Sequence, residues 1–399
     1  MPTGPFDVGR LPRVTFGPGR IGEVPRIVAT HGRHVLVVTG RRSFRGTPAF
    51  GALGDALRHV GLAVEELVVD GEPSPDLVDE AVKTFRGTGV DVVLGIGGGS
   101  VLDAAKAVAG LLRAETLALD HLEGVGRGLA YEGPPTPFVA VPTTAGTGSE
   151  ATRNAVLSRR GPDGFKKSFR DERLVARDAV VDPDLLAGLP PRLIADNGMD
   201  ALAQLIESFT STRASPFTDG IARAGLEAAR DGLVTWHQAA TDGVDAPAAR
   251  AAMAFAALAS GIALAHTGLG SVHGLASPLG ARFPIGHGAA CGATLVAATR
   301  VNLDALADRD PGGPGLARYA EAGRVLTGRR DLDDPAATAA LVELLGSWAA
   351  RLDIGGLSRF GVGEQDIPGL VAEAGGTSMR TNPLVLTDAE VERVIRESL

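Results

Sequence analysis

The chain has a single cysteine, Cys291, among its 399 residues. One cysteine excludes an intrachain disulfide and fits a reducing compartment. No uncharged apolar stretch reaches roughly 18 residues without a glycine interruption, which argues against a membrane span. The N-terminus has neither the basic start nor the apolar run of a signal peptide. These absences predict a soluble, cytoplasmic protein that does not bind a membrane.

The chain also lacks an excess of positive charge, because its formal net charge is −8. This balance argues against a general nucleic-acid binder. Hydrophobic residues make up 44% of the chain and charged residues 22%, values that are ordinary for a soluble globular protein. A length of 399 residues allows two domains with a large buried core.

Short β-branched runs alternate with helical patterns in the first half of the chain. Strands are predicted at 34–39, 63–69, 90–96, 137–141 and 179–182, and helices at 47–60, 75–86 and 101–112. This alternation predicts a parallel sheet covered on both faces. After residue 191 only helical periodicity remains, at 193–212, 217–240, 247–265, 288–308, 315–327, 335–352 and 387–397. We therefore predict an α/β domain at 1–188 and an all-helical domain at 189–399.

Three glycines, Gly97, Gly98 and Gly99, join a predicted strand to a predicted helix. Glycines let the backbone approach a pyrophosphate closely, and a helix N-terminus presents N–H groups to it. Ser100 is the expected N-cap, and Asp103 stands three residues later as in a capping box. The alternative is a tight turn without a ligand. The run is a poor match to the Gly-x-Gly-x-x-Gly fingerprint, because Ser100 occupies the third glycine position.

Two further loops carry features of a nucleotide site. The loop at 141–150 follows a strand and is rich in threonine and glycine, which suits ribose or nicotinamide, although a solvated loop is the plain alternative. After the first predicted strand, Gly40 is followed by Arg41, Arg42 and Ser43, with no carboxylate for the ribose hydroxyls of NADH. The two arginines and the serine can receive a 2′-phosphate. This favours NADPH over NADH, against the alternative of solvated surface arginines.

Four residues in the second half form a candidate metal site. Asp200 and Gln204 are four apart in a helical pattern and therefore project from one helix face. His273 and His287 lie in glycine-rich stretches, fourteen residues apart. One carboxylate and two imidazoles suffice to hold a catalytic divalent metal with a position left open for substrate. A phosphate cradle followed by a metal site suggests a metal-assisted dehydrogenase.

Together these motifs resemble the iron-containing (group III) alcohol dehydrogenase family, over nearly the whole chain. The matching segments are Gly97-Gly-Gly-Ser-x-x-Asp-x-x-Lys106, Pro142-Thr-Thr-x-Gly-Thr-Gly-Ser-Glu150, Val181-Asp-Pro183, Met199-Asp-Ala201 and the His273/His287 spacing. The resemblance implies a Rossmann-like nucleotide-binding domain, an all-α domain and an active site in the cleft between them, as in the dehydroquinate synthase-like architecture. It also implies an oxidoreductase that transfers hydride between NAD(P)H and a metal-bound carbonyl or alcohol, with Fe²⁺ or Zn²⁺, and at least a homodimer.

Residue by residue, the resemblance assigns the glycine run and Ser100 to the pyrophosphate. It assigns the threonines of the second loop, with Lys166, to ribose and nicotinamide; Lys167 is the adjacent alternative. The predicted cofactor contacts are Gly40, Arg41, Ser43, Gly97, Gly98, Gly99, Ser100, Asp103, Thr143, Thr144, Thr147 and Lys166.

The chain departs from the family pattern at two positions. Gln204 stands where the family usually has its second metal-binding histidine, and its amide oxygen is a weaker ligand than imidazole. Ser277 stands where the family usually has a histidine near the nicotinamide. Asp200, His273 and His287 still form a sufficient ligand set. With Gln204 in this position, the chain resembles a branch of the family whose members act on polar or anionic aldehydes.

Four residues are weaker candidates for substrate contact. Arg153 and Arg380 can bind an anionic group, with a structural salt bridge as the alternative for Arg153. Ser277 can relay a proton or fill space. His266, seven residues before His273 and placed on the same helix face, is more simply a histidine of the cleft or core than a further ligand.

The leading hypothesis is a metal-dependent NAD(P)H-linked aldehyde reductase, reversibly an alcohol dehydrogenase, with Asp200, His273 and His287 at its catalytic centre. The first alternative is a metal-free reductase of the same superfamily, which would keep its activity after chelation. The second alternative is a dehydroquinate-synthase-like lyase, which would use NAD without a net change in nicotinamide absorbance. A catalytically silent nucleotide-binding protein is the non-enzyme alternative.

Overall fold

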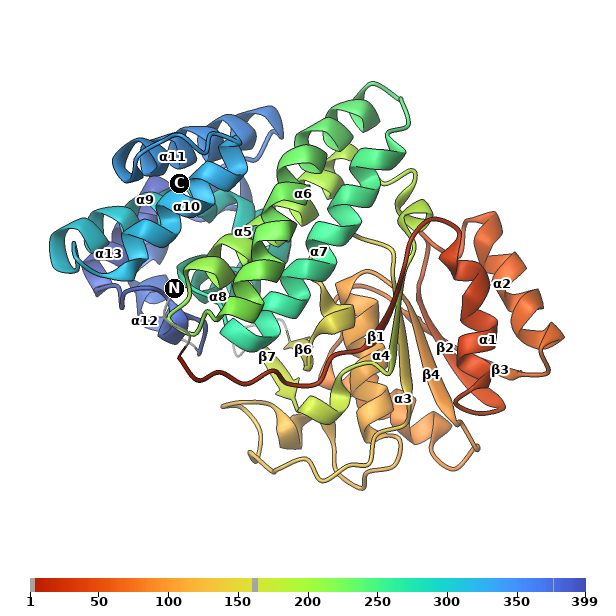
Figure 1. Ribbon diagram of the computed structural model, residues 1–399. Helices are drawn as coiled ribbons and strands as arrows, with labels where there is room; N and C mark the ends of the chain where they lie inside the picture. Colours follow the sequence, from red (N-terminus) through yellow and green to blue (C-terminus); the bar gives the residue numbers. More distant parts are fainter. Residues whose placement is uncertain (1–3, 160–163, 376) are drawn as a thin grey trace. The chain divides into compact units, whose positions relative to one another are not determined.

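The computed structural model describes residues 4–159, 164–375 and 377–399 (Figure 1). The chain divides into two compact units. The α/β unit comprises Gly9–Thr144 and Gly148–Ala187. The helical unit comprises Gly188–Leu399, together with residues 145–147 and the segment that ends at Val8.

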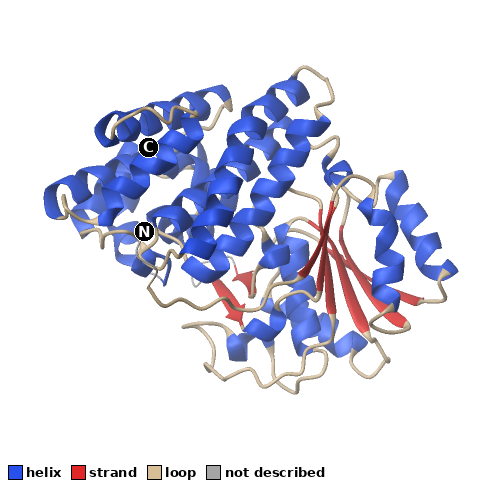
Figure 2. Ribbon diagram, viewed as in Figure 1, coloured by secondary structure: helices blue, strands red, loops and turns tan. Residues whose placement is uncertain are grey.

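The core of the α/β unit is a parallel sheet of six strands, in the order β1-β8-β5-β4-β2-β3 (Figure 2). From β2 the chain adds β3 on one side of the sheet, and β4, β5 and β8 on the other, so the order of the strands reverses between β2 and β4. Open α/β sheets bind ligands at such a point, outside the carboxyl ends of the strands. A separate antiparallel pair is formed by β6 and β7. The strands are β1 (Arg13–Phe16), β2 (His34–Gly40), β3 (Ala63–Val69), β4 (Val92–Gly97), β5 (Phe138–Pro142), β6 (Asn154–Arg159), β7 (Phe165–Arg170) and β8 (Asp178–Val181).

Helices cover both faces of this sheet (Figure 1). Successive side chains of a strand point to opposite faces. Val35 and Val37 of β2 therefore pack with α1 (Val24–Ala29) and α2 (Pro48–His59), whereas Leu36 and Val38 pack with α3 (Pro75–Phe85) and α4 (Gly99–Leu111). Burial on both faces explains why the inner strands β4 and β5 are continuous apolar runs.

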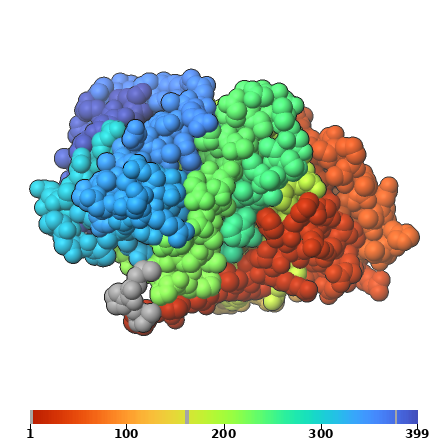
Figure 3. All heavy atoms as spheres, turned by 45° about the horizontal axis from the view of Figure 1, so that its top comes forward, coloured from red at the N-terminus to blue at the C-terminus, as the bar shows by residue number. Residues whose placement is uncertain are grey.

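The helical unit contains long helices with extensive mutual contacts. In the space-filling view the blue atoms of the C-terminal helices and the green atoms of α6 and α7 form one continuous surface (Figure 3). By length and composition α7 resembles a membrane span, but 61% of its most apolar window is buried, as in a core helix. The helices are α5 (Pro191–Thr210), α6 (Pro216–Thr241), α7 (Pro247–Thr267), α8 (Ser271–Arg282), α9 (His287–Arg309), α10 (Pro314–Thr327), α11 (Asp334–Arg351), α12 (Ile367–Glu373) and α13 (Asp388–Glu397).

The predicted fold class, a parallel α/β region followed by a helical region, is confirmed, with two local corrections. The predicted N-cap at Ser100 is wrong, because α4 begins at Gly99 and Gly98 is the N-cap residue. His266 and His273 do not share a helix face, because α7 ends at Thr267 and His273 lies on α8. Gly268, with φ of 70°, separates the two helices.

Candidate active site and cofactor loops

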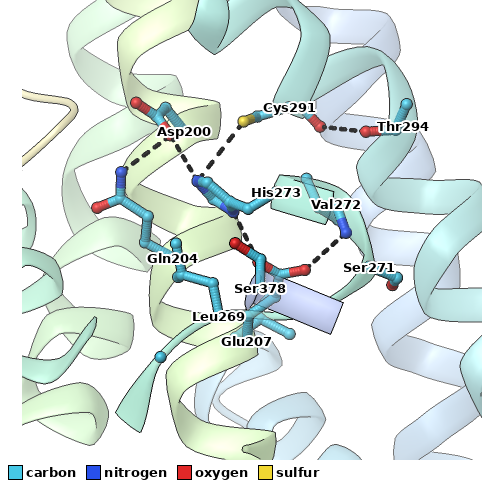
Figure 4. A network of polar contacts seen from close by, with 12 residues as sticks. Asp200, Gln204, Glu207, Leu269, Ser271, Val272, His273, Cys291, Thr294 and Ser378 are labelled. Atoms are coloured by element: carbon cyan, nitrogen blue, oxygen red, sulfur yellow. Dashed lines mark hydrogen bonds and ion pairs between the residues drawn. The ribbon is translucent and has the colours of Figure 1, made fainter. Parts of the chain in front are cut away.

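Three polar side chains project from one face of α5 into the interior of the helical unit (Figure 4). They are Asp200, Gln204 and Glu207, spaced by four and three residues, and all are buried. The spacing places them on consecutive turns of the same face. Asp200 is 1% exposed, so its carboxylate needs partners within the protein.

His273 of α8 lies between two of these carboxylates (Figure 4). Its Nδ1 is 2.6 Å from Glu207 Oε2, and its Nε2 is 3.2 Å from Asp200 Oδ1. The other oxygen of Glu207 accepts a hydrogen bond of 2.7 Å from the backbone N–H of Val272. A carboxylate accepts only, so Nδ1 donates to Glu207. This arrangement orients the ring and aims Nε2 at Asp200.

The N-terminal part of α9 supplies two more groups, His287 and Cys291, four residues apart on one face. His287 Nε2 is 3.7 Å from Asp200 Oδ1. Cys291 Sγ is 3.7 Å from His273 Nε2 and 3.9 Å from His287 Nε2. One ligand atom each from Asp200, His273, His287 and Cys291 lies within 4.8 Å of the others. We call these four residues the ligand cluster.

Gln204 has a fixed orientation beside this cluster. Its Nε2 donates a hydrogen bond of 2.9 Å to Asp200 Oδ1. Its Oε1 accepts one of 2.6 Å from Ser260 Oγ on α7. Because an ionised carboxylate only accepts hydrogen bonds, the NH₂ group must face Asp200, and the amide oxygen therefore points away from the cluster.

The charges of the ligand cluster support one another. Burial by itself raises the pKa of Asp200, but the neighbouring His287 and His273 outweigh it and hold that pKa below its usual value. Burial opposes a charge on His273, yet Cys291, Glu207 and Asp200 together place its pKa well above the usual value. Burial raises the pKa of the Cys291 thiol to about 12. Carboxylate, imidazole and thiol groups that converge in this way fit a divalent metal.

The predicted phosphate cradle lies at the carboxyl end of β4, beside the reversal of strand order. A Cβ at Gly97 would lie 2.6 Å from Cβ of Val101, and one at Gly98 would lie 3.2 Å from the Thr144 side chain. The N–H of Thr143 donates to the carbonyl of Gly97 at 3.0 Å. The glycine run and the threonine-rich loop therefore lie against one another, joined by a backbone hydrogen bond and by the close approach of Thr144 to Gly98. A helix start free of side chains can present its N–H groups to a phosphate.

Asp103 is turned toward the protein interior. It accepts a hydrogen bond of 2.6 Å from Ser149 and lies 3.9 Å from the buried ammonium of Lys106. Lys106 is also bonded to Ser149, Thr152 and the carbonyl of Asn154. Burial lowers the pKa of Lys106 to about 8. These bonds fix the end of the threonine-rich loop against α4.

Among the other predicted cofactor residues, Lys166 and Arg41 form ion pairs within the protein. Lys166 forms an ion pair of 2.6 Å with Glu72. Arg41 forms one of 2.8 Å with Asp70, and both side chains are exposed. Gly40 ends β2, and Ser43 is exposed in the following loop.

The weaker candidates for substrate contact lie on different segments of the chain. Arg153 forms an ion pair of 3.1 Å with Glu172 in the α/β unit, which is the structural salt bridge expected as the alternative to substrate binding. His266 is 2.7 Å from the carbonyl of Ile262 through Nδ1. Ser277 is exposed one turn beyond His273 on α8, and Arg380 is exposed on the 3₁₀ helix η8 (Thr377–Thr381).

Three residues of the site were not predicted from the sequence: Glu207, Cys291 and Ser260. Two of them carried a signal, because Glu207 is seven residues after Asp200 and Cys291 is four after His287. Both spacings return to the same helix face. Ser260 had none, because its contact with Gln204 joins two helices 56 residues apart.

Comparison with known proteins identifies the family. The family model described as iron-containing alcohol dehydrogenase matches residues 12–183, and the model of the family's C-terminal domain matches residues 194–399. The chain therefore belongs to the iron-containing alcohol dehydrogenase family. It is an oxidoreductase that acts on CH–OH groups, as an alcohol dehydrogenase or aldehyde reductase. The predicted family and enzyme class are confirmed.

Individual relatives cover most of the chain. NAD-dependent methanol dehydrogenase of Bacillus methanolicus is 30% identical over 97% of this chain and 98% of its own length. Phosphonoacetaldehyde reductase of Streptomyces viridochromogenes is 36% identical over 79% of this chain and 76% of its own. The structure of sulfoacetaldehyde reductase from Bifidobacterium kashiwanohense in complex with NAD⁺ has 28% identity and a TM-score of 0.83, over 98% of both chains.

Proposed function

We propose that this enzyme reduces polar or anionic aldehydes with NADPH or NADH, reversibly, and depends on one divalent metal, Fe²⁺ or Zn²⁺. The convergence of Asp200, His273 and His287 within 4.8 Å carries the proposal. A divalent ion held by these residues supplies Lewis-acid polarisation of a substrate carbonyl. Zinc and iron both accept a two-histidine, one-carboxylate set.

The protein residues have distinct roles in this proposal. Asp200 provides the negative charge that offsets part of the charge of a cation in a buried site. His273 is oriented by its bond to Glu207, which keeps Nε2 available as a ligand. The His287 side chain is 27% exposed, more than the other two ligands, and marks the side of the cluster open to a small molecule.

The nucleotide is proposed to bind the α/β unit at the carboxyl ends of β2, β4 and β5. Gly97, Gly98, Gly99 and Ser100 would hold the pyrophosphate at the start of α4. Arg41 and Ser43 after β2 favour the 2′-phosphate of NADPH, although Arg41 would have to leave Asp70. When bound, the nicotinamide supplies the hydride.

An anionic substrate is supported by the names of two relatives. One reduces phosphonoacetaldehyde and the other sulfoacetaldehyde. Arg380 is the candidate for the anionic group in this chain, because it lies on η8, which packs against the helix of His273. A cytoplasmic homodimer or larger homo-oligomer is also proposed, and its mass in solution tests that assembly.

Metal analysis together with a nicotinamide assay tests the proposed function. Protein purified without chelator is expected to hold about one Zn or Fe per chain and to oxidise NADPH or NADH with an aldehyde panel. Chelation and Asp200→Ala should each remove both metal and turnover. Full activity in metal-free protein would instead identify a metal-free reductase. Turnover without a net change in nicotinamide absorbance would identify a lyase.

A further inference from the structure

We propose that Cys291, and not Gln204, is the fourth protein ligand of the metal. This inference rests on the proposed function, because it supposes a divalent metal at the ligand cluster. It replaces the predicted weak ligand, an amide oxygen, with a sulfur atom from a different helix. The set becomes one carboxylate, two imidazoles and one thiolate.

The distances from Asp200 and from Cys291 to the two imidazoles are close to those expected around one tetrahedral ion. Zinc–ligand bonds of about 2.0–2.1 Å to nitrogen and oxygen and about 2.3 Å to sulfur separate N from O by about 3.3 Å and S from N by about 3.6 Å. The Nε2 atoms of His273 and His287 lie 3.2 and 3.7 Å from Asp200 Oδ1. Cys291 Sγ lies 3.7 and 3.9 Å from the same two nitrogens. The sulfur therefore lies close enough to both imidazoles to share one ion with them.

Local structure aims the sulfur at this point. His287 begins α9 and Cys291 follows one turn later, so their side chains share a face. Cys291 is fully buried, and its neighbours at the cluster are polar: two imidazoles and the Asp200 carboxylate. A cysteine that serves only as a small apolar group is found against apolar side chains. These surroundings are those of a ligand.

The hydrogen bonds of Gln204 direct its amide oxygen away from the ligand cluster. A metal would need its amide oxygen, but that oxygen is held by Ser260 at 2.6 Å. The NH₂ group that faces the cluster has no lone pair to offer and is bonded to Asp200. Gln204 is therefore a positioning residue that orients the carboxylate ligand.

Sulfur ligation has consequences for the choice of metal. On binding, the S–H bond breaks, the sulfur–metal bond forms and the proton passes to solvent. A soft thiolate favours Zn²⁺ over Fe²⁺ relative to an oxygen or nitrogen donor. Zinc also accepts a fifth ligand during catalysis, so four protein ligands leave the proposed reaction possible. We accordingly assign zinc as the preferred metal.

Cobalt substitution tests this assignment directly. The protein is stripped of metal with a chelator and reloaded with one equivalent of Co²⁺. Cys291 is the only cysteine of the chain, so a thiolate-to-cobalt charge-transfer band in the near ultraviolet can arise from no other residue. We expect this band in the wild type and its loss in Cys291→Ser, with the visible cobalt bands kept.

Zinc affinity, measured against a chromophoric chelator, provides a second readout. Cys291→Ser and Cys291→Ala should bind zinc at least about 10²-fold more weakly, since loss of an outer-shell partner alone costs 10–100-fold. Thr294→Ser, on the next turn of α9, is the control and should keep both band and affinity. Circular dichroism of each variant verifies folding.

The outcomes separate the two proposals. Cobalt bound at one per chain without a thiolate band, or unchanged zinc affinity in both cysteine variants, overturns the role of Cys291 and leaves the metal-dependent function intact. Failure of the wild type to bind either ion overturns both.

Discussion

The side-chain amide of Gln204 donates a hydrogen bond of 2.9 Å to Oδ1 of Asp200. The same oxygen of Asp200 lies 3.2 Å from His273 Nε2 and 3.7 Å from His287 Nε2. One carboxylate oxygen is therefore shared between a fixed amide donor and the two histidines. The glutamine sets the direction of a buried anion around which the other ligands are arranged.

Gln204→Leu tests this positioning role. The change removes the bond to Asp200 but leaves no unpaired hydroxyl, because Ser260 Oγ also lies 2.8 Å from the carbonyl of Ala257. We expect zinc affinity to fall by about 10–100-fold while the free energy of unfolding drops by only about 1 kcal/mol. Competition with a chelator and chemical unfolding measure the two effects. Gln238→Leu, at an exposed position of α6, is the control; equal affinity in both variants would contradict the role.

Glu207 is expected to control the orientation of His273. Its two oxygens accept from His273 Nδ1 and from the N–H of Val272. The Gln side chain in Glu207→Gln has only one acceptor oxygen, so either His273 Nδ1–H or the N–H of Val272 would face its NH₂ group and lose its acceptor. Metal affinity should fall by about 10–100-fold, and an unpaired buried donor should destabilise the protein by about 1–3 kcal/mol. Glu343→Gln, exposed on α11, should change neither quantity, and unchanged affinity in Glu207→Gln would dismiss the idea.

The sheet and most helices could be predicted from the sequence because their burial patterns are local. The strand predicted at 34–39 is β2, His34–Gly40, and the helix predicted at 75–86 is α3, Pro75–Phe85. β1 was missed, because it is a four-residue edge strand without a fully buried residue. α8 was missed because Pro278 and two glycines interrupt its sequence pattern.

Side-chain partners were harder to predict than elements. Periodicity reports which face of a helix is buried but not which helix it meets. The bond from His273 to Glu207 joins residues 66 apart, and the contact of Cys291 with His273 joins two different helices. The identity of Asp200, His273 and His287 as candidates followed from residue type. Their hydrogen-bond partners required the packing of α5, α8 and α9.

Glu150 should make stability fall as pH rises through the acidic range. Burial raises its pKa from 4.5 to about 7, against the opposing effect of Lys106. Between these values the folded protein holds a proton that the unfolded chain has released, so the contribution of Glu150 to stability is highest below pH 4.5 and decreases up to about pH 7. The loss is at most about 3 kcal/mol.

Glu150→Gln removes this titration. The thermal midpoint of the wild type, relative to that of the variant, should therefore be higher at pH 5 than at pH 8. Glu132→Gln, exposed in the same unit, supplies the reference for removal of a surface charge. A difference between wild type and Glu150→Gln that does not vary with pH would show that Glu150 does not titrate in this range.

Arg380 is expected to determine preference for anionic substrates. It is exposed on η8, and a Cβ at Gly274, next to His273, would lie 2.9 Å from the side chain of Met379. A charge-assisted bond to a phosphonate or sulfonate is worth about 1.5–3 kcal/mol. Arg380→Ala should raise KM for phosphonoacetaldehyde or sulfoacetaldehyde by about 10–100-fold and leave KM for propanal unchanged. Arg359→Ala is the matched control, and a parallel rise for propanal would exclude charge recognition.

Gly98→Ala tests the phosphate cradle. The new methyl group would stand 3.2 Å from the Thr144 side chain, a tight contact that a small shift relieves, but it would occupy the N-cap position of α4 where a phosphate is proposed to approach. We expect affinity for NADPH to fall by at least about 10-fold, with a thermal midpoint close to that of the wild type. Gly51→Ala is the control, because its methyl group meets no atom within 4 Å and alanine favours the α2 helix. Fluorescence titration of bound NADPH measures both variants. If Gly98→Ala binds NADPH as tightly as Gly51→Ala, the pyrophosphate does not lie on the start of α4, and the glycine run serves only the turn between β4 and α4.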